Sequence, residues 1–131
     1  MNLALDVNAA VAFVMGQDET HVIDKFILNA DYIFVPELFI FETSNVFWKL
    51  HKLQNLSLKV CENFMAKVLD IPDEIVSGSI LYSSAWKLAT ELHHSTYDMF
   101  YLALAAQESA ALLTRDKCLK ELAQKMGIKV L

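Results

Sequence analysis

Short apolar runs alternate with longer segments of helical periodicity, and this alternation limits the possible folds more than any other feature of the chain. The run "NLALD" at 2–6 ends in Asp6, and "YIFV" at 32–35 and "ALLT" at 111–114 are equally short and apolar. Between them, apolar residues recur every three or four positions, as in an amphipathic helix. Strands that alternate with helices are typical of a parallel sheet covered by helices on both faces. The sequence therefore predicts an α/β sandwich with a mostly parallel central sheet.

Few residues favour tight turns, since the chain has only three Gly and two Pro, and long helices are expected. Asn8, Pro36 and Ser57 are suited to begin helices, and Gly127 is suited to end the last one. No repeat, low-complexity tract or linker divides the 131 residues, so a single domain over residues 1–131 is predicted. The expected helices cover about residues 9–15, 20–29, 36–53, 58–68, 79–92, 95–109 and 117–125, with further short strands at 73–76 and 128–131.

The composition is that of a folded protein without a membrane span. Hydrophobic residues make up 55% of the chain and charged residues 21%, which excludes a disordered tail. The longest uncharged stretch, 75–86, has 12 residues with four Ser among them, and it is too short and too polar to cross a bilayer. The start, "MNLALDVN", has no basic segment before its apolar run and is not a signal peptide. We therefore expect no membrane association and a cytoplasmic location.

Cysteines, histidines and net charge narrow the possible sites. Cys61 and Cys118 lie 57 residues apart within helical patterns, without CxxC or zinc-finger spacing, so buried and reduced thiols are expected. None of the four His residues is expected to be a ligand. The net charge of −5 argues against a protein that coats nucleic acid with a basic surface. It is compatible with an enzyme that meets nucleic acid at one metal-filled pocket.

Four acidic residues are predicted to reach one edge of the sheet. Asp6 closes the first strand, and Asp116 comes shortly after the strand at 111–114. Glu42 lies about one and a half turns into the helix after the second strand, and Asp98 lies near the start of a later helix. All four can meet where ligands collect in an open parallel sheet, at the carboxyl ends of the strands. Plain structural roles are also open: Asp6 and Asp116 as turn or cap residues, and Glu42 as an exposed helical side chain.

Asp98 stands at the entrance of an apolar helical segment, "STYDMFYLALAAQES". Ser95 can be the N-cap of this helix, and Asp98, three residues later, is favoured by the positive end of the helix dipole. A metal ligand is the alternative, and this segment alone does not decide between the two. The residues here that can face a core are Met99, Phe100, Leu102, Ala103, Ala106 and Ala110.

Four neighbouring carboxylates do not all stay ionised without compensation. Either some take up protons with raised pKa values, or divalent cations neutralise them. The absence of Cys or His ligands nearby favours Mg²⁺ or Mn²⁺ over Zn²⁺. Such a site suits phosphodiester hydrolysis, because the ion polarises a phosphate and lowers the pKa of a bound water.

Four segments, "LALDVNAAV", "VPELFIFETSNVFWKL", "STYDMFYLALAAQ" and "ALLTRDKCL", resemble in order and spacing the motifs of PIN-domain ribonucleases, above all the VapC-type toxins of toxin–antitoxin pairs. The resemblance covers essentially the whole chain. It implies a single PIN-like three-layer sandwich and an endoribonuclease, dependent on Mg²⁺ or Mn²⁺, that hydrolyses RNA. The implied catalytic and metal-binding residues are Asp6, Glu42, Asp98 and Asp116, and the implied supporting residues are Asn8, Asn45 and Thr114.

The stretch 38–48 carries more apolar residues than one helix face can bury, and the next helix adds Leu58, Phe64 and Met65. These residues either belong to a thick ordinary core or are covered by a second chain. VapC-like toxins pair with themselves and receive an antitoxin segment along these helices. The resemblance therefore implies a homodimer and a cognate antitoxin protein, in addition to the RNA substrate.

Three other functions are compatible with an acidic α/β domain. A phosphoacceptor receiver domain would show adjacent acids after its first strand, but here Val7 follows Asp6. It would also show a Lys near its last strand, often followed by Pro, but here Val130 follows Lys129. A non-catalytic PIN-like scaffold that binds RNA or protein would have lost one or more acids, and none is lost. A PIN nuclease of RNA processing or decay would have the same residues as a toxin, so this alternative stays open.

Overall fold

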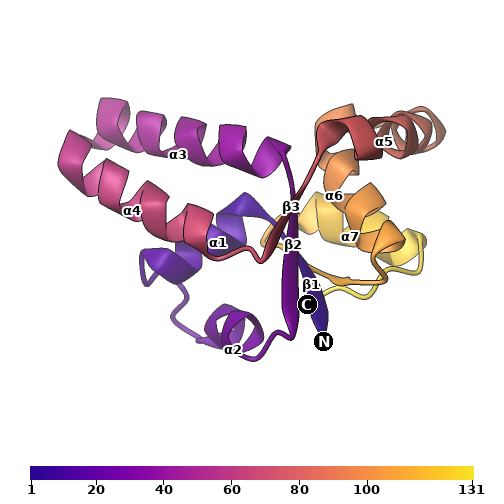
Figure 1. The fold of residues 1–131 in the computed structure, drawn as a ribbon, viewed down its shortest axis with the longest axis horizontal. Helices are drawn as coiled ribbons and strands as arrows, with labels where there is room; N and C mark the ends of the chain where they lie inside the picture. The colour runs from indigo at the N-terminus through magenta and orange to yellow at the C-terminus, as the bar shows by residue number, and fades with distance from the viewer.

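Strands and helices alternate along the chain, as the sequence predicts (Figure 1). The computed structural model describes residues 1–131. The strands are β1 (Asn2–Leu5), β2 (Tyr32–Pro36), β3 (Glu74–Val76) and β4 (Ala111–Leu113). The helices are α1 (Val7–Val14), α2 (Val22–Leu28), α3 (Leu38–Gln54), α4 (Leu58–Asp70), α5 (Gly78–Leu92), α6 (Thr96–Gln107) and α7 (Lys117–Lys125). No helix combines the length and the hydropathy that a membrane crossing requires.

The four strands form one parallel sheet in the order β3-β2-β1-β4. Asn2 pairs with Tyr32 and Leu3 pairs with Ala111, so β1 lies at the centre between β2 and β4. Central parallel strands are buried on both faces, which explains why they read as continuous apolar runs in the sequence. All four strands end at the same edge of the sheet, which lies between α3 on one side and α5 and α6 on the other (Figure 1).

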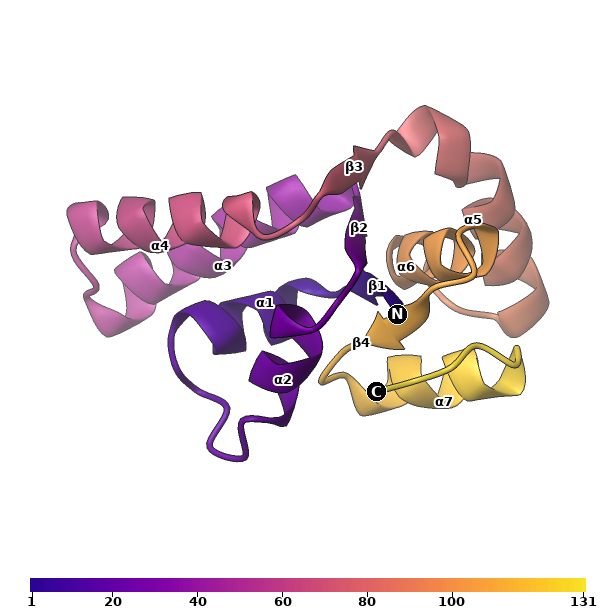
Figure 2. The same cartoon turned by 60° about the horizontal axis from the view of Figure 1, so that its bottom comes forward.

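Two helical layers cover the sheet. Helices α1 to α4 lie against one face, and α5 to α7 lie against the other (Figures 1 and 2). Alternating side chains of β1 supply both cores, since Leu3 and Leu5 pack in the cluster that contains Phe39, while Ala4 packs in the cluster that contains Met99. The predicted three-layer α/β sandwich is confirmed, and its sheet is parallel throughout.

Two helices begin differently from the prediction. Asp6, not Asn8, is the N-cap of α1, because its extended backbone and its carboxylate, which accepts a hydrogen bond from the Val7 amide, start the helix there. Pro36 is the last residue of β2, in register with Val76, and does not open α3. Its missing N–H costs the sheet at most one hydrogen bond, at the last position of the strand.

The predicted strand at 128–131 is wrong in extent. Gly127, with a φ of 73°, ends α7 as expected and turns the chain back toward the sheet. Only Val130 then bridges to Leu112, and the Leu131 amide donates to the Leu112 carbonyl at 3.0 Å. Since β4 has only three residues, it offers no longer ladder to this segment.

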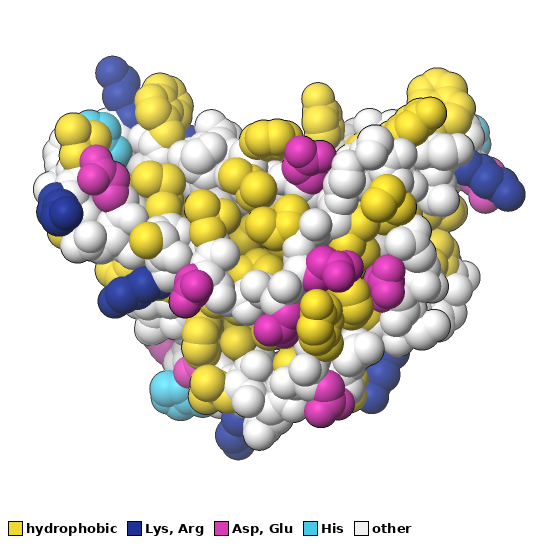
Figure 3. Space-filling view, viewed as in Figure 1, with side chains coloured by type: hydrophobic (Ala, Val, Ile, Leu, Met, Phe, Trp, Pro, Cys, Tyr) yellow, Lys and Arg dark blue, Asp and Glu magenta, His cyan; other side chains and the backbone are white.

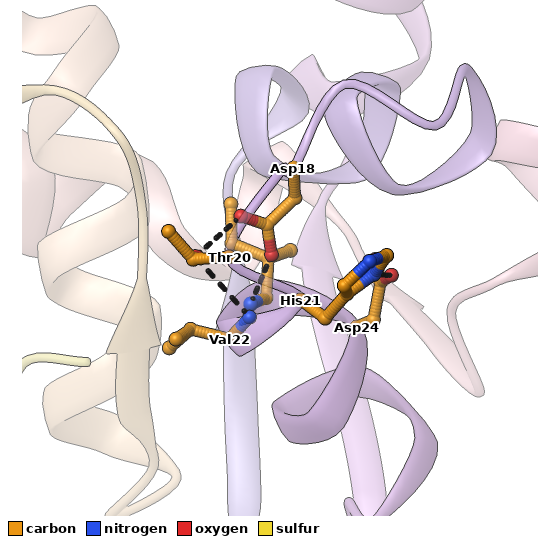
Figure 4. A network of polar contacts seen from close by, with 6 residues as sticks. Asp18, Thr20, His21, Val22 and Asp24 are labelled. Atoms are coloured by element: carbon orange, nitrogen blue, oxygen red, sulfur yellow. Dashed lines mark hydrogen bonds and ion pairs between the residues drawn. The ribbon is translucent and has the colours of Figure 1, made fainter.

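A local network of hydrogen bonds fixes the loop before α2 (Figure 4). The Asp18 carboxylate accepts from the Thr20 hydroxyl at 2.8 Å and from the Ile23 amide at 2.6 Å. His21 has a left-handed backbone, with a φ of 55°, and so interrupts the helical geometry. The helix therefore begins at Val22 and not at Thr20, where the sequence predicts it.

Candidate metal centre

The carboxyl edge of the sheet brings together the four acidic residues. Asp6 follows β1 and Asp116 follows β4, and each is also the N-cap of the next helix. Glu42 lies in the second turn of α3 and Asp98 in the first turn of α6. Burial, and then the charges of Asp98 and Asp116, raise the pKa of Asp6; burial, and then the charges of Asp6 and Asp98, raise the pKa of Glu42. Each of the four carboxylates therefore lies within electrostatic range of at least two of the others.

Asp6 is the most buried of the four. Its side chain Oδ1 accepts from the Val7 amide at 2.7 Å, and its Oδ2 accepts from the Thr114 hydroxyl at 2.6 Å. Burial raises the pKa of Asp6 to about 6, although both hydrogen bonds favour the ionised form. Thr114 is itself buried, so it fixes the orientation of Asp6 from the end of β4.

Thr114 also connects Asp6 to Asp116. Its hydroxyl donates to Asp6 and accepts from the Asp116 amide at 3.0 Å. The Asp116 Oδ1 accepts from the Leu119 amide at 3.1 Å, which caps α7, while its Oδ2 makes no hydrogen bond within the chain. Capping and metal binding are therefore compatible in Asp116, since each can use a different oxygen.

Glu42 is held by Tyr101, which no pattern in the sequence marks as a site residue. The Tyr101 hydroxyl donates to Glu42 Oε1 at 2.6 Å and so connects α6 to α3. Burial and the nearby carboxylates raise the pKa of Tyr101 well above its usual range. Residues 101–105 of α6 are all buried, so no amphipathic pattern marks Tyr101 as special. Ala106, which by its spacing can face a core, is exposed.

Asp98 makes no capping hydrogen bond. Ser95 is the N-cap of α6, but its side chain accepts no bond from the helix, and Asp98 binds no backbone amide. Asp98 Oδ2 lies 3.7 Å from His94 Nε2 instead. Burial raises the pKa of Asp98, His94 opposes this shift, and the charge of Asp116 adds to it. The half-buried Asp98 carboxylate therefore remains available at the edge of the sheet.

The cysteines differ from each other in burial. Cys61 is buried, as predicted, but Cys118 is exposed, so the prediction for Cys118 is wrong. The reason is the surface position of α7, which buries only Leu119 and Ala123. Cys118 Sγ lies 3.8 Å from His94 Nε2.

The two asparagines that the resemblance singles out have exposed side chains without hydrogen bonds to the rest of the chain. Asn8 lies in the first turn of α1 and lines a cavity that Asp116 also lines. Asn45 lies three residues after Glu42, and so on the same side of α3. Asn8 thus borders the acidic edge directly.

The donors at this edge fit a hydrated hard cation. The four carboxylates offer only oxygen, which suits Mg²⁺ or Mn²⁺. No three His, Cys, Asp or Glu side chains converge tightly enough to enclose an ion by themselves. Mg²⁺ does not require such a cage, because it keeps several waters and binds through one or two carboxylates. A cation here would also oppose the effects of burial and of mutual repulsion, which together raise the pKa values of Asp6, Glu42 and Asp98.

Known proteins share this architecture. PAE2754 from Pyrobaculum aerophilum superposes with a TM-score of 0.77 at 22% identity, over 99% of this chain and 83% of that one. The VapBC2 structure from Rickettsia felis, bound to a DNA fragment from its promoter, gives 0.68 at 18% identity, over 100% and 98%. FitAcB from Neisseria gonorrhoeae gives 0.66 at 16% identity, over 98% and 96%. A comparison with curated protein sequences finds no match.

Identities this low show a shared fold and nothing finer. The sequence itself carries a stronger signal, because the profile of the PIN domain matches residues 3–125. This match spans nearly the whole chain and includes all four acidic residues of the carboxyl edge. The chain belongs to the PIN-domain family.

Proposed function

We propose that this protein is an endoribonuclease, dependent on Mg²⁺ or Mn²⁺, that hydrolyses RNA phosphodiester bonds as the toxin of a toxin–antitoxin pair. The observation that carries the proposal is the meeting of four carboxylates at one edge, three of them with raised pKa values. A cation at such a cluster would offset both the cost of burying the charges and the repulsion between them. Membership of the PIN-domain family, whose members are typically Mg²⁺-dependent nucleases, supports the same chemistry.

The four carboxylates would contribute to cation binding in two different ways. Thr114 orients Asp6 and Tyr101 orients Glu42, so these two are held in place before any ion arrives. The other two keep at least one oxygen without a hydrogen bond and can turn toward an ion. A bound Mg²⁺ or Mn²⁺ supplies Lewis acidity toward a phosphate oxygen and lowers the pKa of a coordinated water.

Replacement of one carboxylate by an amide tests this proposal. We expect the wild-type protein to cleave single-stranded RNA in Mg²⁺ or Mn²⁺ and to stop when EDTA is added. Asp98→Asn should reduce cleavage to the level of the EDTA control without a change in the circular dichroism spectrum, because an amide is a poor ligand for a hard cation. Asp70→Asn, at an exposed site on α4, is the matched control. Cleavage by Asp98→Asn at the wild-type rate would show that Asp98 is no ligand.

The surface of α3 and α4 is where we place the antitoxin. Phe41, Trp48 and Leu53 are 60%, 59% and 75% exposed, and hydrophobic side chains gather over these helices in Figure 3. Trp48 also borders a cavity of about 210 Å³ between the two helices. Such a surface fits an amphipathic segment, and a basic residue of that segment could reach the acids and block metal or RNA.

If the protein is a toxin, the gene immediately upstream of its own should encode the antitoxin. A pull-down with the product of that upstream gene tests this claim. The wild-type protein should capture it, and Trp48→Asp should capture much less. Leu28→Asp is the control, since Leu28 is also exposed (73%) but lies on α2. Equal capture by both variants would place the partner elsewhere.

We also propose a homodimer, which would cover further apolar surface. Ile80, Tyr82 and Trp86 of α5 are 59%, 62% and 64% exposed, away from α3 and α4. Sedimentation at tens of micromolar should show a dimer. A monomer that binds no upstream product would contradict both partner claims and leave the nuclease proposal standing, in which case RNA processing or decay becomes the better role.

A further inference from the structure

A cavity beside Asp116 has the size and the floor of a nucleotide site. It measures about 390 Å³ and has an apolar floor made of Val11, Val46 and Leu50. Small-molecule pockets run from about 300 to 1,000 Å³, so this one is large enough for a nucleobase with its sugar.

The cavity continues directly from the acidic edge. Glu42, Val46 and Leu50 are spaced by four residues, so they follow one another along the same face of α3. Asn8 and Val11 line the cavity from α1. Asp116 of the acidic edge also lines the cavity, so the two sites adjoin. A strand with its reacting phosphate at the acids would therefore place a neighbouring nucleotide in the cavity.

Arg115 gives the cavity a positive charge. It is the only arginine of the chain, and it directly precedes Asp116 at the cavity wall. It forms no ion pair, since the ion pairs of the molecule lie at the N-terminus, in α2 and at His94. A free guanidinium with planar donors suits a phosphate, which it can bind with two parallel hydrogen bonds.

Two amide side chains complete the lining. Asn8 and Gln17 both line the cavity; the Asn8 side chain makes no hydrogen bond within the chain, and Gln17 Nε2 makes only a long one, to Met15 Sδ at 3.9 Å. The backbone that carries Gln17 is fixed, because Gly16 turns with a φ of 65° and the Gln17 amide donates to the Ala12 carbonyl at 2.8 Å. Amides of this kind offer both donors and acceptors to the edge of a base.

We propose that this cavity is a subsite for one nucleotide of the RNA, next to the phosphate at the acidic edge. Arg115 holds a phosphate of that nucleotide, Asn8 and Gln17 contact the base edge, and the apolar floor covers the base face. The inference rests on the proposed ribonuclease function for its substrate class. It adds the residues that determine which base is preferred in the nucleotide next to the scissile phosphate.

The affinity for RNA tests the role of Arg115. An Asp98→Asn parent in Mg²⁺ keeps a fluorescein-labelled single-stranded RNA dodecamer intact while its anisotropy is read. Adding Arg115→Ala should weaken binding about tenfold, as expected for a hydrogen bond to a charged group. The slope of log affinity against log salt should fall by about 0.7. Lys125→Ala, which removes the same charge at the far end of α7, should change neither. Equal losses in the two variants, or none in Arg115→Ala, overturn the subsite.

The preference among bases tests the role of Gln17. Homopolymeric RNA dodecamers of the four bases should bind the parent with different affinities. Gln17→Ala should reduce the ratio between the highest and the lowest affinity about fivefold, as expected for the loss of a neutral hydrogen bond. Gln54→Ala, at the exposed end of α3, is the matched control. An unchanged spread in Gln17→Ala overturns the base contact.

Cleavage assays keep this inference separate from the proposed nuclease function. If the wild-type protein cuts no RNA but binding still depends on Arg115, the nuclease proposal fails and the subsite stands. If Arg115→Ala cuts RNA with the wild-type kcat and KM, the subsite fails and the nuclease proposal stands. If Arg115→Ala no longer captures the protein encoded by the upstream gene but binds RNA as before, the cavity binds that protein and not RNA. This result would also overturn the subsite.

Discussion

Asp6 and Asp98 belong to the same acidic edge, yet the chain holds them in opposite ways. Asp6 is buried at a strand end, and both of its oxygens accept hydrogen bonds, from the Val7 amide and the Thr114 hydroxyl. Asp98 is half-buried on a helix, accepts no such bond and lies 3.7 Å from His94. Burial fixes Asp6 in place and raises its pKa to about 6. In the proposed metal site, the fold would thus hold Asp6 in place before an ion binds, whereas Asp98 could still adjust its position.

The pH dependence of stability should show the burial of Asp6 most strongly. Its pKa rises from 3.8 to about 6 on folding, so the folded chain binds a proton that the unfolded chain has released. In the metal-free protein, the free energy of unfolding should therefore fall as the pH rises from about 3 to 7, by on the order of 3 kcal/mol from this group. Denaturant titrations in EDTA at the two ends of this range measure the fall.

Asp6→Asn should remove most of this dependence. The raised pKa values of Glu42 and Asp98 act in the same direction, so a smaller fall should remain. Asp70→Asn should behave like the wild-type protein. If Asp6→Asn keeps the full fall between these pH values, the carboxylate of Asp6 is not the group that burial penalises.

Thr114→Val should sharpen the comparison by removing the partner that holds Asp6. The substitution leaves Asp6 Oδ2 buried without a donor and the Asp116 amide without an acceptor. We expect a loss of about 2 kcal/mol in the free energy of unfolding at neutral pH. Thr43→Val is the control, because the equally buried Thr43 only donates to the Phe39 carbonyl, and its loss should be about 1 kcal/mol or less. Equal losses of stability in the two variants would mean that the hydrogen bond to Asp6 stabilises the protein no more than an ordinary buried hydrogen bond.

Tyr101→Phe should have the smallest effect on stability, about 1 kcal/mol, since Glu42 is only half-buried and can turn to water. The same variant should raise the pKa of Glu42 further, because the hydroxyl that favours its ionised form is gone. Carboxyl NMR titration measures that pKa directly. Tyr97→Phe, at an exposed site, is the control, and an unmoved Glu42 titration in Tyr101→Phe would argue against the positioning role.

The strand ends explain what could be predicted from the sequence. Asp6 and Asp116 come directly after apolar runs, and a parallel sheet places such positions at one edge. Glu42 and Asp98 could be placed near that edge because each lies within the first two turns of a helix, one of which follows a strand and the other precedes one. Thus the layers, the parallel sheet and the position of the acids all follow from local patterns.

Contacts across helices could not be predicted in this way. Tyr101 lies in a helix that is buried on nearly every side, so its link to Glu42 leaves no periodic signal. His94 approaches Asp98 only because His93 turns the chain with a φ of 53° between α5 and α6. Cys118 reads as a core residue in the sequence, and its exposure depends on how α7 sits on the sheet.

The claim that these acids hold a divalent cation is tested most directly by thermal unfolding in Mn²⁺ or Mg²⁺. An ion that binds the folded state raises the Tm, so the wild-type protein should melt later as metal is added. The double variant Asp6→Asn with Asp116→Asn keeps groups that can accept hydrogen bonds from Val7 and Leu119, but it loses two charges. It should be more stable than the wild-type protein without metal and should lose most of the metal-induced shift, while Asp70→Asn keeps it. An unchanged shift in the double variant would place the ion elsewhere and contradict the account.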